Sequence, residues 1–147
     1  MVDLRAIDGL DDAITPLVAE ADGEGFRFMR RLQDDWRSGV NRFDGRGEFL
    51  LGAYDAGRLV AVGGLNVDPY ATGNDVGRVR HVYVANAARR SGVGAILLRR
   101  IIAEAAPVFA VLRLRTNTAA GAAFYESLGF ECTTDAAATH IMRLRAV

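Results

Sequence analysis

The stretch Arg89-Arg90-Ser91-Gly92-Val93-Gly94-Ala95 joins a β-like run, residues 80–84, to an apolar helical run, residues 93–105. A turn that leads into a helix N-terminus presents unpaired backbone N–H groups and the positive end of the helix dipole. Its two glycines carry no Cβ that would keep a pyrophosphate from those amides, and its two arginines add positive charge. The stretch therefore predicts a strand, a phosphate-binding turn and a helix.

On the C-terminal side of this turn, the sequence predicts further strands and one more helix. The helix after the turn is expected to stop before Pro107, and the alternating residues 108–115 predict a strand. Because strand, helix and strand follow one another, the two strands should be parallel neighbours. Residues 119–127 predict a short helix, and residues 130–133 and 139–145 predict a last pair of strands.

The residues before the turn predict a strand, two helices and three strands, over residues 4–7, 12–21, 25–37, 49–54, 59–67 and 78–84. Asp55-Ala56-Gly57 joins two of these strands into a β-hairpin. Gly63-Gly64, within the second hairpin strand, indicates either a bulge or a ligand that approaches the backbone closely. The complete order predicts one α+β domain over residues 1–147 with a mixed, mostly antiparallel central sheet.

Composition limits the classes of function. The 18 basic residues, all of them arginine, balance 18 acidic ones, so the net charge offers no general attraction to nucleic acid or to an anionic membrane. The absence of lysine indicates a GC-rich bacterial genome. Cys132 is the only cysteine, which argues against disulfides and a cysteine-based metal cluster and favours a reducing cytoplasm. The N-terminus lacks the pattern of a signal peptide, and no apolar run is long enough to span a membrane.

The turn matches neither of the common nucleotide fingerprints. The sequence contains no G-x-x-x-x-G-K-[ST], and no G-x-G-x-x-G with an acidic residue some twenty positions later. A P-loop nucleotidase and a Rossmann dehydrogenase are therefore disfavoured.

Two motifs, in this order along the chain, do resemble a known signature. His81-Val82-Tyr83-Val84 followed by Arg89-x-x-Gly92-x-Gly94-Ala95, and then Asn117 with Ala123-Phe124-Tyr125-Glu126-x-Leu128-Gly129-Phe130, are similar to the acetyl-CoA signature of the GNAT superfamily of N-acetyltransferases. The resemblance implies a sheet with helices on both faces, in which the two parallel strands splay apart.

The resemblance also implies where acetyl-CoA binds. The pantetheine arm would lie between the splayed strands and bond to their backbone, and the pyrophosphate would lie on the amides of the glycine turn. The implied cofactor-binding residues are Val82, Tyr83, Val84, Arg89, Arg90, Ser91, Gly92, Val93, Gly94, Ala95 and Asn117. The two valines are also suited to the core, and Asn117 or Thr118 is suited to cap the next helix.

Tyr125 is the predicted catalytic residue. Acetyl transfer from a thioester to an amine expels a thiolate, and a positioned phenol can protonate that sulfur as a general acid. Packing of the short helix is the alternative role for this side chain.

The sequence does not identify a single residue as the general base. The amine must lose a proton before it attacks, and the carboxylate that many family members hold at the start of the strand before the turn is replaced here by Arg78 and Arg80. The candidates for the general base are His81, Glu48, Asp68 and a chain of waters. Strand alternation is expected to point His81 away from the cleft.

The sequence patterns and the resemblance support two candidate functions. The first is an acetyl-CoA-dependent N-acetyltransferase that acetylates a small-molecule or peptide amine directly, without metal and without a covalent intermediate on Cys132. The second is a CoA-binding regulatory or interaction module with weak catalysis, suggested by the missing carboxylate.

Acceptor recognition is expected from Phe26, Trp36, Asp68 and Tyr70, for which packing and turn formation are equally suitable roles. The sequence does not identify the acceptor. It also does not decide whether the donor is strictly acetyl-CoA or whether the protein forms a homodimer.

Overall fold

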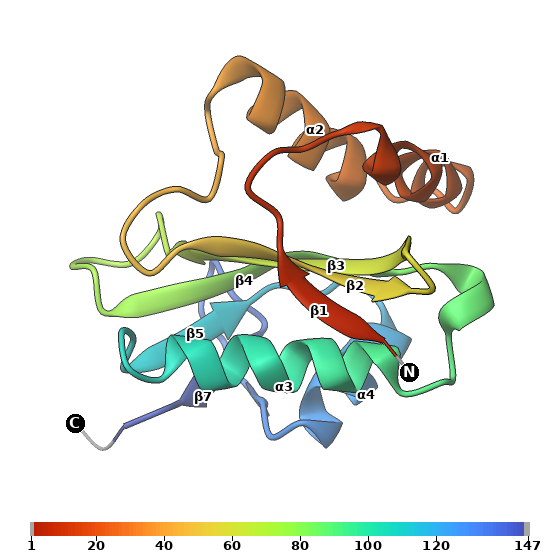
Figure 1. Cartoon of the computed structure of the whole chain (residues 1–147). Coiled ribbons are helices and arrows are strands. Elements are labelled where there is room, and N and C mark those ends of the chain that lie inside the picture. The colour runs from red at the N-terminus through yellow and green to blue at the C-terminus, as the bar shows by residue number, and fades with distance from the viewer. Residues whose placement is uncertain (1, 146–147) are drawn as a thin grey trace.

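The computed structural model of the protein describes residues 2–145, and its strands form one sheet with helices on both faces (Figure 1). The strands are β1 (Asp3–Ala6), β2 (Phe49–Asp55), β3 (Arg58–Val67), β4 (Val76–Val84), β5 (Val111–Leu114), β6 (Glu131–Cys132) and β7 (His140–Arg143). The helices are α1 (Thr15–Gly23), α2 (Phe28–Ser38), α3 (Val93–Ala105) and α4 (Ala119–Ser127), with short 3-10 turns at Asp12–Ile14 and Asn86–Ala88. The sheet order is β1-β2-β3-β4-β5-β7-β6. Among these strands only β4 and β5 pair in parallel, which confirms the predicted fold class.

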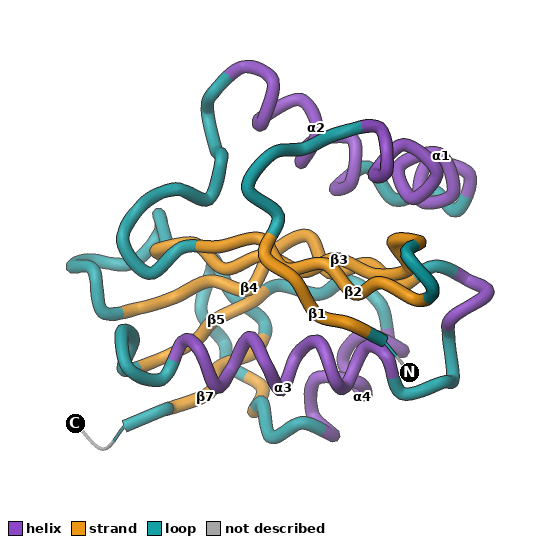
Figure 2. Tube along the Cα trace, viewed as in Figure 1, coloured by secondary structure: helices purple, strands orange, loops and turns teal. Residues whose placement is uncertain are grey.

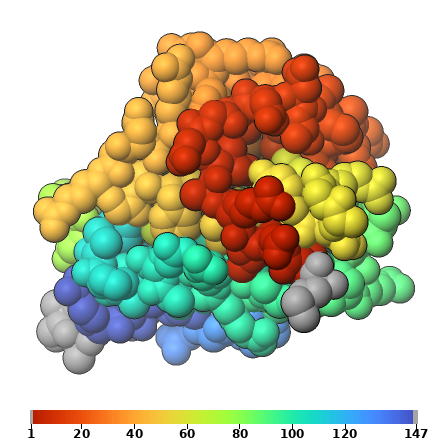
Figure 3. Space-filling model, in the orientation of Figure 1, coloured from red at the N-terminus to blue at the C-terminus, as the bar shows by residue number. Residues whose placement is uncertain are grey.

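The helices form two layers that bury the two faces of the sheet. Helices α1 and α2 cover one face, and α3 and α4 cover the other (Figure 2). Leu97, Leu98 and Ile101 of α3 are fully buried against the sheet, as are Met29 and Leu32 of α2. The apolar stripe of α2 therefore packs in the core. Figure 3 shows the N-terminal layer in red and orange on one side of the molecule and the C-terminal segments in blue on the other.

The N-terminal helices begin later than their sequence pattern predicts. The predicted helix 12–21 divides into a 3-10 turn and α1, and the predicted helix 25–37 begins only at Phe28. Gly25 has a φ of 86°, a left-handed conformation that ends one helix and cannot lie within the next. None of the helices within residues 2–145 combines the length and hydropathy that a membrane-crossing segment needs.

The parallel strands β4 and β5 pair over only three positions and then separate. Their register runs from Val76 opposite Val111 to Arg78 opposite Arg113. Strand β4 continues to Val84, whereas β5 ends at Leu114. The second half of β4 therefore has one edge that no neighbouring strand pairs with in the described chain.

A β-bulge in β4 changes which residues point toward α2. Strand β3 pairs Val62 with Tyr83 and Gly64 with Arg80, so two residues of β4, His81 and Val82, lie opposite a single residue of β3. His81 takes a φ of 58°, which a non-glycine residue adopts in this way only at a bulge or turn. The bulge places the His81 ring on the α2 face, where its Nδ1 lies 2.9 Å from the carbonyl oxygen of Phe28.

The glycine pair on β3 serves packing. A Cβ on Gly64 would lie 2.4 Å from Cε1 of Phe43, and one on Gly63 would lie 2.9 Å from Cδ1 of Ile101. The bulge that the pair predicted does occur, but its extra residue is on β4. The alternative of a ligand at these glycines gains no support, because neither contributes to the cleft described below.

Candidate active site

A cleft of about 1090 Å³ opens where β4 and β5 separate. It runs from the N-terminus of α3, along the free edge of β4, to the residues beneath α2. Among the predicted site residues, those that line it are Val82, Tyr83, Val84, Arg89, Arg90, Gly92, Val93, Gly94, Ala95, Asn117 and Tyr125. The fold thus gathers residues from β4, α3 and α4 around one space. Ser91 is not among the lining residues, and its hydroxyl donates to the carbonyl of Ala88.

The free edge of β4 offers backbone hydrogen-bonding groups to this space. The N–H of Ala85 donates to the carbonyl of Val60 on β3 at 2.8 Å. Successive residues of a strand direct their N–H and C=O groups to opposite edges. The backbone groups of Val84, and of Val82 two residues earlier, therefore point away from β3 and into the cleft. Both valine side chains also pack against the core on the α3 face, so the two predicted roles are compatible.

The N-terminus of α3 is open to an anion. Its cap residue, Gly92, has a φ of 85° and offers no side-chain cap, so the amides of the first turn lack an acceptor from a capping side chain. A Cβ on Gly92 would meet no atom within 4 Å, which leaves free space at these amides. Gly94 has a different role, because its Cβ would lie 3.3 Å from the ring of Phe124 on α4.

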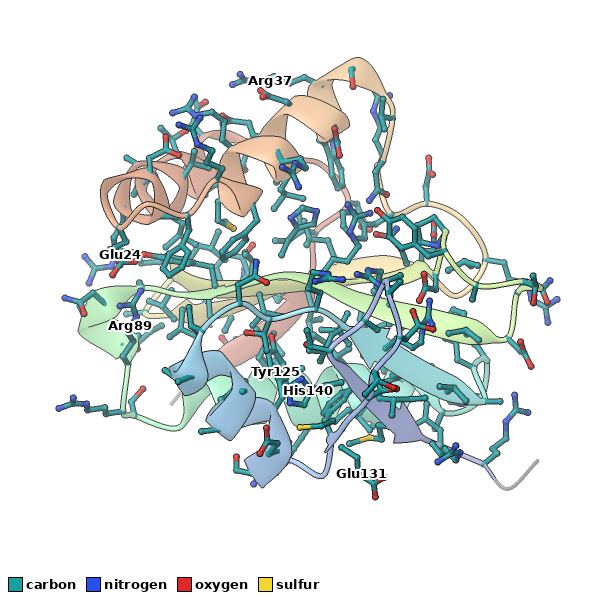
Figure 4. All side chains as sticks on the ribbon, turned by 180° about the vertical axis from the view of Figure 1, so that it is seen from behind. Glu24, Arg37, Arg89, Tyr125, Glu131 and His140 are labelled. Carbon is teal, nitrogen blue, oxygen red and sulfur yellow. The ribbon has the colours of Figure 1, made fainter. Side chains whose placement is uncertain are left out.

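Arg89 makes an ion pair across the rim of the cleft. Its guanidinium donates to both carboxylate oxygens of Glu24, at 2.7 and 2.8 Å, and its Nε donates to the carbonyl of Val84 at 3.0 Å. Figure 4 shows the two side chains meeting at one edge of the molecule. The hydrogen bonds from Arg89 and from Tyr83 lower the pKa of Glu24 to about 2. No sequence pattern indicated Glu24, which lies 65 residues before Arg89 in the chain.

Tyr125 projects from α4 toward the cleft (Figure 4). Its ring packs edge-on against Phe124 and Phe130, with centroids 5.1 and 5.7 Å away. Only 9% of the residue is exposed, and this burial raises the pKa of its phenol. The hydroxyl therefore stays protonated at neutral pH, as a general acid must.

Of the three side chains considered as bases, His81 alone lines the cleft. Glu48 accepts hydrogen bonds from the backbone N–H of Val67 at 2.9 Å and from Asn66 at 3.1 Å. Asp68 is buried and lies 2.7 Å from Arg113. Both carboxylates therefore hold the structure together, away from the cleft.

His81 lines the cleft, contrary to the expectation from strand alternation. The bulge turns its ring to the α2 face, and its Nδ1–H donates to the carbonyl of Phe28. The Nε2 atom, which then carries the lone pair, is buried and has no hydrogen-bond partner among the described residues. Burial, and next the charge of Arg80, lower the pKa of His81 to about 4, so the ring is neutral at pH 7.

The structure also separates the roles of Asn117 and Thr118. The hydroxyl of Thr118 caps α4 by accepting a hydrogen bond from the N–H of Gly121 at 3.0 Å. Asn117 is therefore not needed as the cap, and it is exposed at the cleft. This position is compatible with the contact to the pantetheine arm that the sequence predicts.

The predicted acceptor-binding residues divide into two groups. Phe26 and Tyr70 line the cleft. Trp36 stacks on Phe43 with a centroid distance of 6.3 Å and belongs to the core beneath α2. Asp68 is fully enclosed by its arginine partners.

Cys132 has two polar neighbours that no sequence pattern indicated. Its Sγ lies 3.6 Å from Oε2 of Glu126 and 3.7 Å from Nε2 of His140, which are themselves 2.9 Å apart. Their atoms are close enough together to share a metal ion, although the cysteine and the glutamate are exposed. The three residues do not line the cleft.

Comparisons with known proteins show the family and the fold. A family model described as an acetyltransferase (GNAT) domain matches residues 46–132. A candidate acetyltransferase from Exiguobacterium sp. 255-15 superposes with a TM-score of 0.85 at 30% identity, over 97% of this chain and 93% of that one. The ribosomal-protein-S18-alanine N-acetyltransferase from Escherichia coli superposes with a TM-score of 0.71 at 18% identity, over 100% and 96%. A search of curated proteins found no significant match.

Proposed function

Because the chain belongs to the GNAT acetyltransferase family, we propose that it transfers an acetyl group from acetyl-CoA directly to a primary amine of a small molecule or peptide. The observation that carries the proposal is the single cleft that joins an open helix N-terminus, an unpaired strand edge and Tyr125. The first two features suit the donor, and the third suits the leaving group.

The donor would bind along the length of the cleft. The amides at Gly92 to Ala95 would donate hydrogen bonds to the pyrophosphate, since they lack a side-chain cap and the space beside Gly92 is empty. The amide groups of the pantetheine arm would pair with the backbone of Val82 and Val84, as an added strand does. The thioester would then lie between β4 and Tyr125.

The reaction needs one nucleophilic attack and two proton movements. The lone pair of the neutral amine attacks the thioester carbonyl carbon, and the tetrahedral intermediate collapses as the C–S bond breaks. Tyr125 donates its phenolic proton to the departing sulfur, and the proton of the amine passes to Nε2 of His81 or to water. The Tyr125 phenolate then takes a proton from solvent, which returns the residue to its protonated form.

A covalent route through Cys132 is disfavoured by its position. The thiol lies on β6 outside the cleft, and the charge of Glu126 raises its pKa. A thiol with a raised pKa forms less of the nucleophilic thiolate. The acetyl group is therefore expected to pass to the acceptor within a ternary complex.

A CoA-binding module without catalysis is the second candidate. It is favoured by one observation, since the described residues that line the cleft include no carboxylate that could serve as a base. Both candidates predict binding of CoA esters, and only the first predicts transfer.

The deciding experiment is an amine panel incubated with acetyl-CoA and assayed for thiol release. We expect transfer with at least one amine, and we expect Tyr125→Phe to lower kcat by at least tenfold while the protein still binds CoA, because general acids contribute about 10² to 10⁴. An unchanged rate contradicts the role of Tyr125. Binding of acetyl-CoA without transfer to any amine supports the module instead.

Two controls extend this experiment. Acetyl-CoA at about 100 times its Kd should stabilise the fold by about 2.7 kcal/mol, and no thermal shift with any CoA ester would refute both candidates. Cys132→Ala should keep the wild-type kinetics. A ping-pong pattern that this substitution abolishes would contradict direct transfer.

A further inference from the structure

We propose that the amine acceptor also carries an oxyanion, a carboxylate or a phosphate, which Arg31 and Arg80 bind beside His81. The proposal rests on the proposed acetyltransferase function and names the class of its acceptor.

The charge of the cleft is entirely positive among the described residues that line it. Six arginines and no aspartate or glutamate contribute to its wall. Arg89 and Arg90 stand at the N-terminus of α3, where the phosphates of the donor are expected. The other four arginines, whose charges the donor pyrophosphate does not explain, are Arg31, Arg78, Arg80 and Arg115.

Two of these four arginines are held by the protein itself. Arg78 is buried, lies 3.5 Å from the carboxylate of Asp68 and donates to the carbonyl of Ala137 at 2.8 Å. Arg115 donates to the carbonyl of Ala136. These contacts fix the two side chains in the wall of the cleft. Arg78 shares a cluster with Arg113, Asp68 and Asp135, whereas no carboxylate pairs with Arg115 within residues 2–145.

Arg31 and Arg80 have no carboxylate partner within residues 2–145. Neither forms an ion pair, and the one hydrogen bond of the Arg80 guanidinium is a long one, 3.5 Å, to the side-chain oxygen of Asn66. They come from two elements, α2 and β4, that meet at the cleft beside His81. Their charges both lower the pKa of His81, so both lie within electrostatic reach of its ring. Unpaired guanidinium groups that line one cleft can each bind a carboxylate or phosphate through paired N–H groups, and Arg31 also borders a second pocket that Asp34 and Asp35 line.

Three buried side-chain polar atoms have no hydrogen-bond partner in the described chain, and two of them belong to residues that line the cleft, while the third, Nη2 of Arg113, does not. Nε2 of His81 and Nη1 of Arg78 are buried without a hydrogen-bond partner in the described chain, and both residues are at least nine-tenths buried. Buried polar atoms are rarely left unpaired unless a ligand or water completes them. An acceptor amine can complete the first of these atoms, because its N–H group can donate to Nε2 of His81, whereas Nη1 of Arg78 already faces the carboxylate of Asp68 at 3.5 Å.

The positive field also excludes a class of acceptors. Ammonium groups are repelled by these arginines, and no carboxylate on the described wall can hold them. Polyamines and lysine-rich peptides carry several such groups and should be poor acceptors. An oxyanion on the acceptor supplies the attraction, and the surrounding cations favour the neutral, nucleophilic form of its amine.

The test compares acceptors that share an amine and differ in the anion. The panel pairs β-alanine with propylamine and phosphoethanolamine with ethanolamine, and it includes α-amino acids with their amides, and spermidine. We expect kcat/KM for the anionic member of at least one pair to exceed that for its neutral partner by at least tenfold, since hydrogen bonds to charged groups contribute about 1.5–3 kcal/mol. The pairs also distinguish a carboxylate from a phosphate.

Three variants test the assignment to residues. Arg31→Gln and Arg80→Gln should each raise KM for the anionic acceptor at least fivefold and should change KM for its neutral partner by less than twofold. Arg99→Gln, which removes the same charge from the exposed face of α3, should behave as wild type. Calorimetric titration of the acceptor into each protein, after saturation with CoA, measures acceptor binding without turnover.

The outcomes separate this proposal from the one it rests on. If no amine of any charge releases thiol, the acetyltransferase proposal fails. If neutral amines or spermidine are acetylated as well as the anionic acceptors, only the oxyanion proposal fails. The comparison of acceptors uses the wild-type protein, so a variant that does not fold leaves the decision intact.

Discussion

Replacing His81 with asparagine should make the protein less sensitive to acid. The pKa of His81 is about 4 in the folded protein, because burial and the charges of Arg80 and Arg31 oppose protonation, whereas the value for an exposed histidine is 6.5. Between pH 4 and pH 6.5 this histidine is mostly protonated in the unfolded chain and mostly neutral in the folded chain. The free energy of unfolding therefore falls as the pH drops below 6.5, and this loss is complete below pH 4.

The size of the effect follows from the same two values. A tenfold change in proton affinity corresponds to about 1.4 kcal/mol, so the full loss is about 3 kcal/mol, of which about 2 kcal/mol falls between pH 7.5 and pH 5. Asparagine tolerates the φ of 58° at this position and does not titrate. The difference in unfolding free energy between wild type and His81→Asn should shift by about 2 kcal/mol over that interval, in favour of the variant at low pH.

Urea denaturation at half-unit steps from pH 5 to pH 7.5 measures this difference, and subtraction of the two curves cancels the groups that both proteins share. A difference that does not vary with pH would refute the neutral, buried state of His81. NMR of the imidazole in the folded protein gives a second measurement, since at most about one-tenth of the rings should be protonated above pH 5.

Three further substitutions test separate parts of the structure. Gly64→Ala should destabilise the fold by about 1–3 kcal/mol in chemical denaturation, because its Cβ would overlap the buried ring of Phe43; a neutral result would mean that this ring moves aside freely. Glu24→Gln should tighten CoA binding about two- to fivefold in calorimetry, since it removes a negative charge from the rim and releases Arg89 for the phosphates; weaker binding would show that the ion pair instead holds the loop in its binding form. Thr118→Ala should cost about 1 kcal/mol of stability through the lost cap of α4, and an unchanged melting temperature would contradict that cap.

The order of elements could be predicted from the sequence because local signals define it. Turn glycines, the spacing of apolar residues and Pro107 identify the strands and helices to within a few residues in most cases. The predicted helix over residues 119–127 agrees with α4 at both ends, since Thr118 caps it and Gly129 takes a φ of 102° just after it. The resemblance in β4, the glycine turn and α4 also placed most of the predicted site residues on one cleft.

Features that depend on tertiary contacts could not be predicted in this way. The bulge that turns His81 toward α2 arises from the pairing of β4 with β3, and periodicity alone predicted the opposite orientation. The ion pair of Arg89 with Glu24 joins residues far apart in the chain, so the sequence did not show that this arginine is already engaged. Strand β5 begins three residues later than the alternation suggests, because its pairing with β4 begins only at Val111.

Calorimetric titration of acetyl-CoA into wild type, Gly92→Ala and Gly57→Ala tests the central claim most directly. The two glycines have φ values of 85° and 81° and no atom within 4 Å of a built Cβ, so alanine strains both turns alike, by about 1–2 kcal/mol. Gly57 lies in the hairpin turn away from the cleft. If the amides at the N-terminus of α3 hold the pyrophosphate, Gly92→Ala should raise the Kd at least tenfold and Gly57→Ala should leave it within twofold. Equal affinities for all three proteins, or no binding to wild type, would contradict the account.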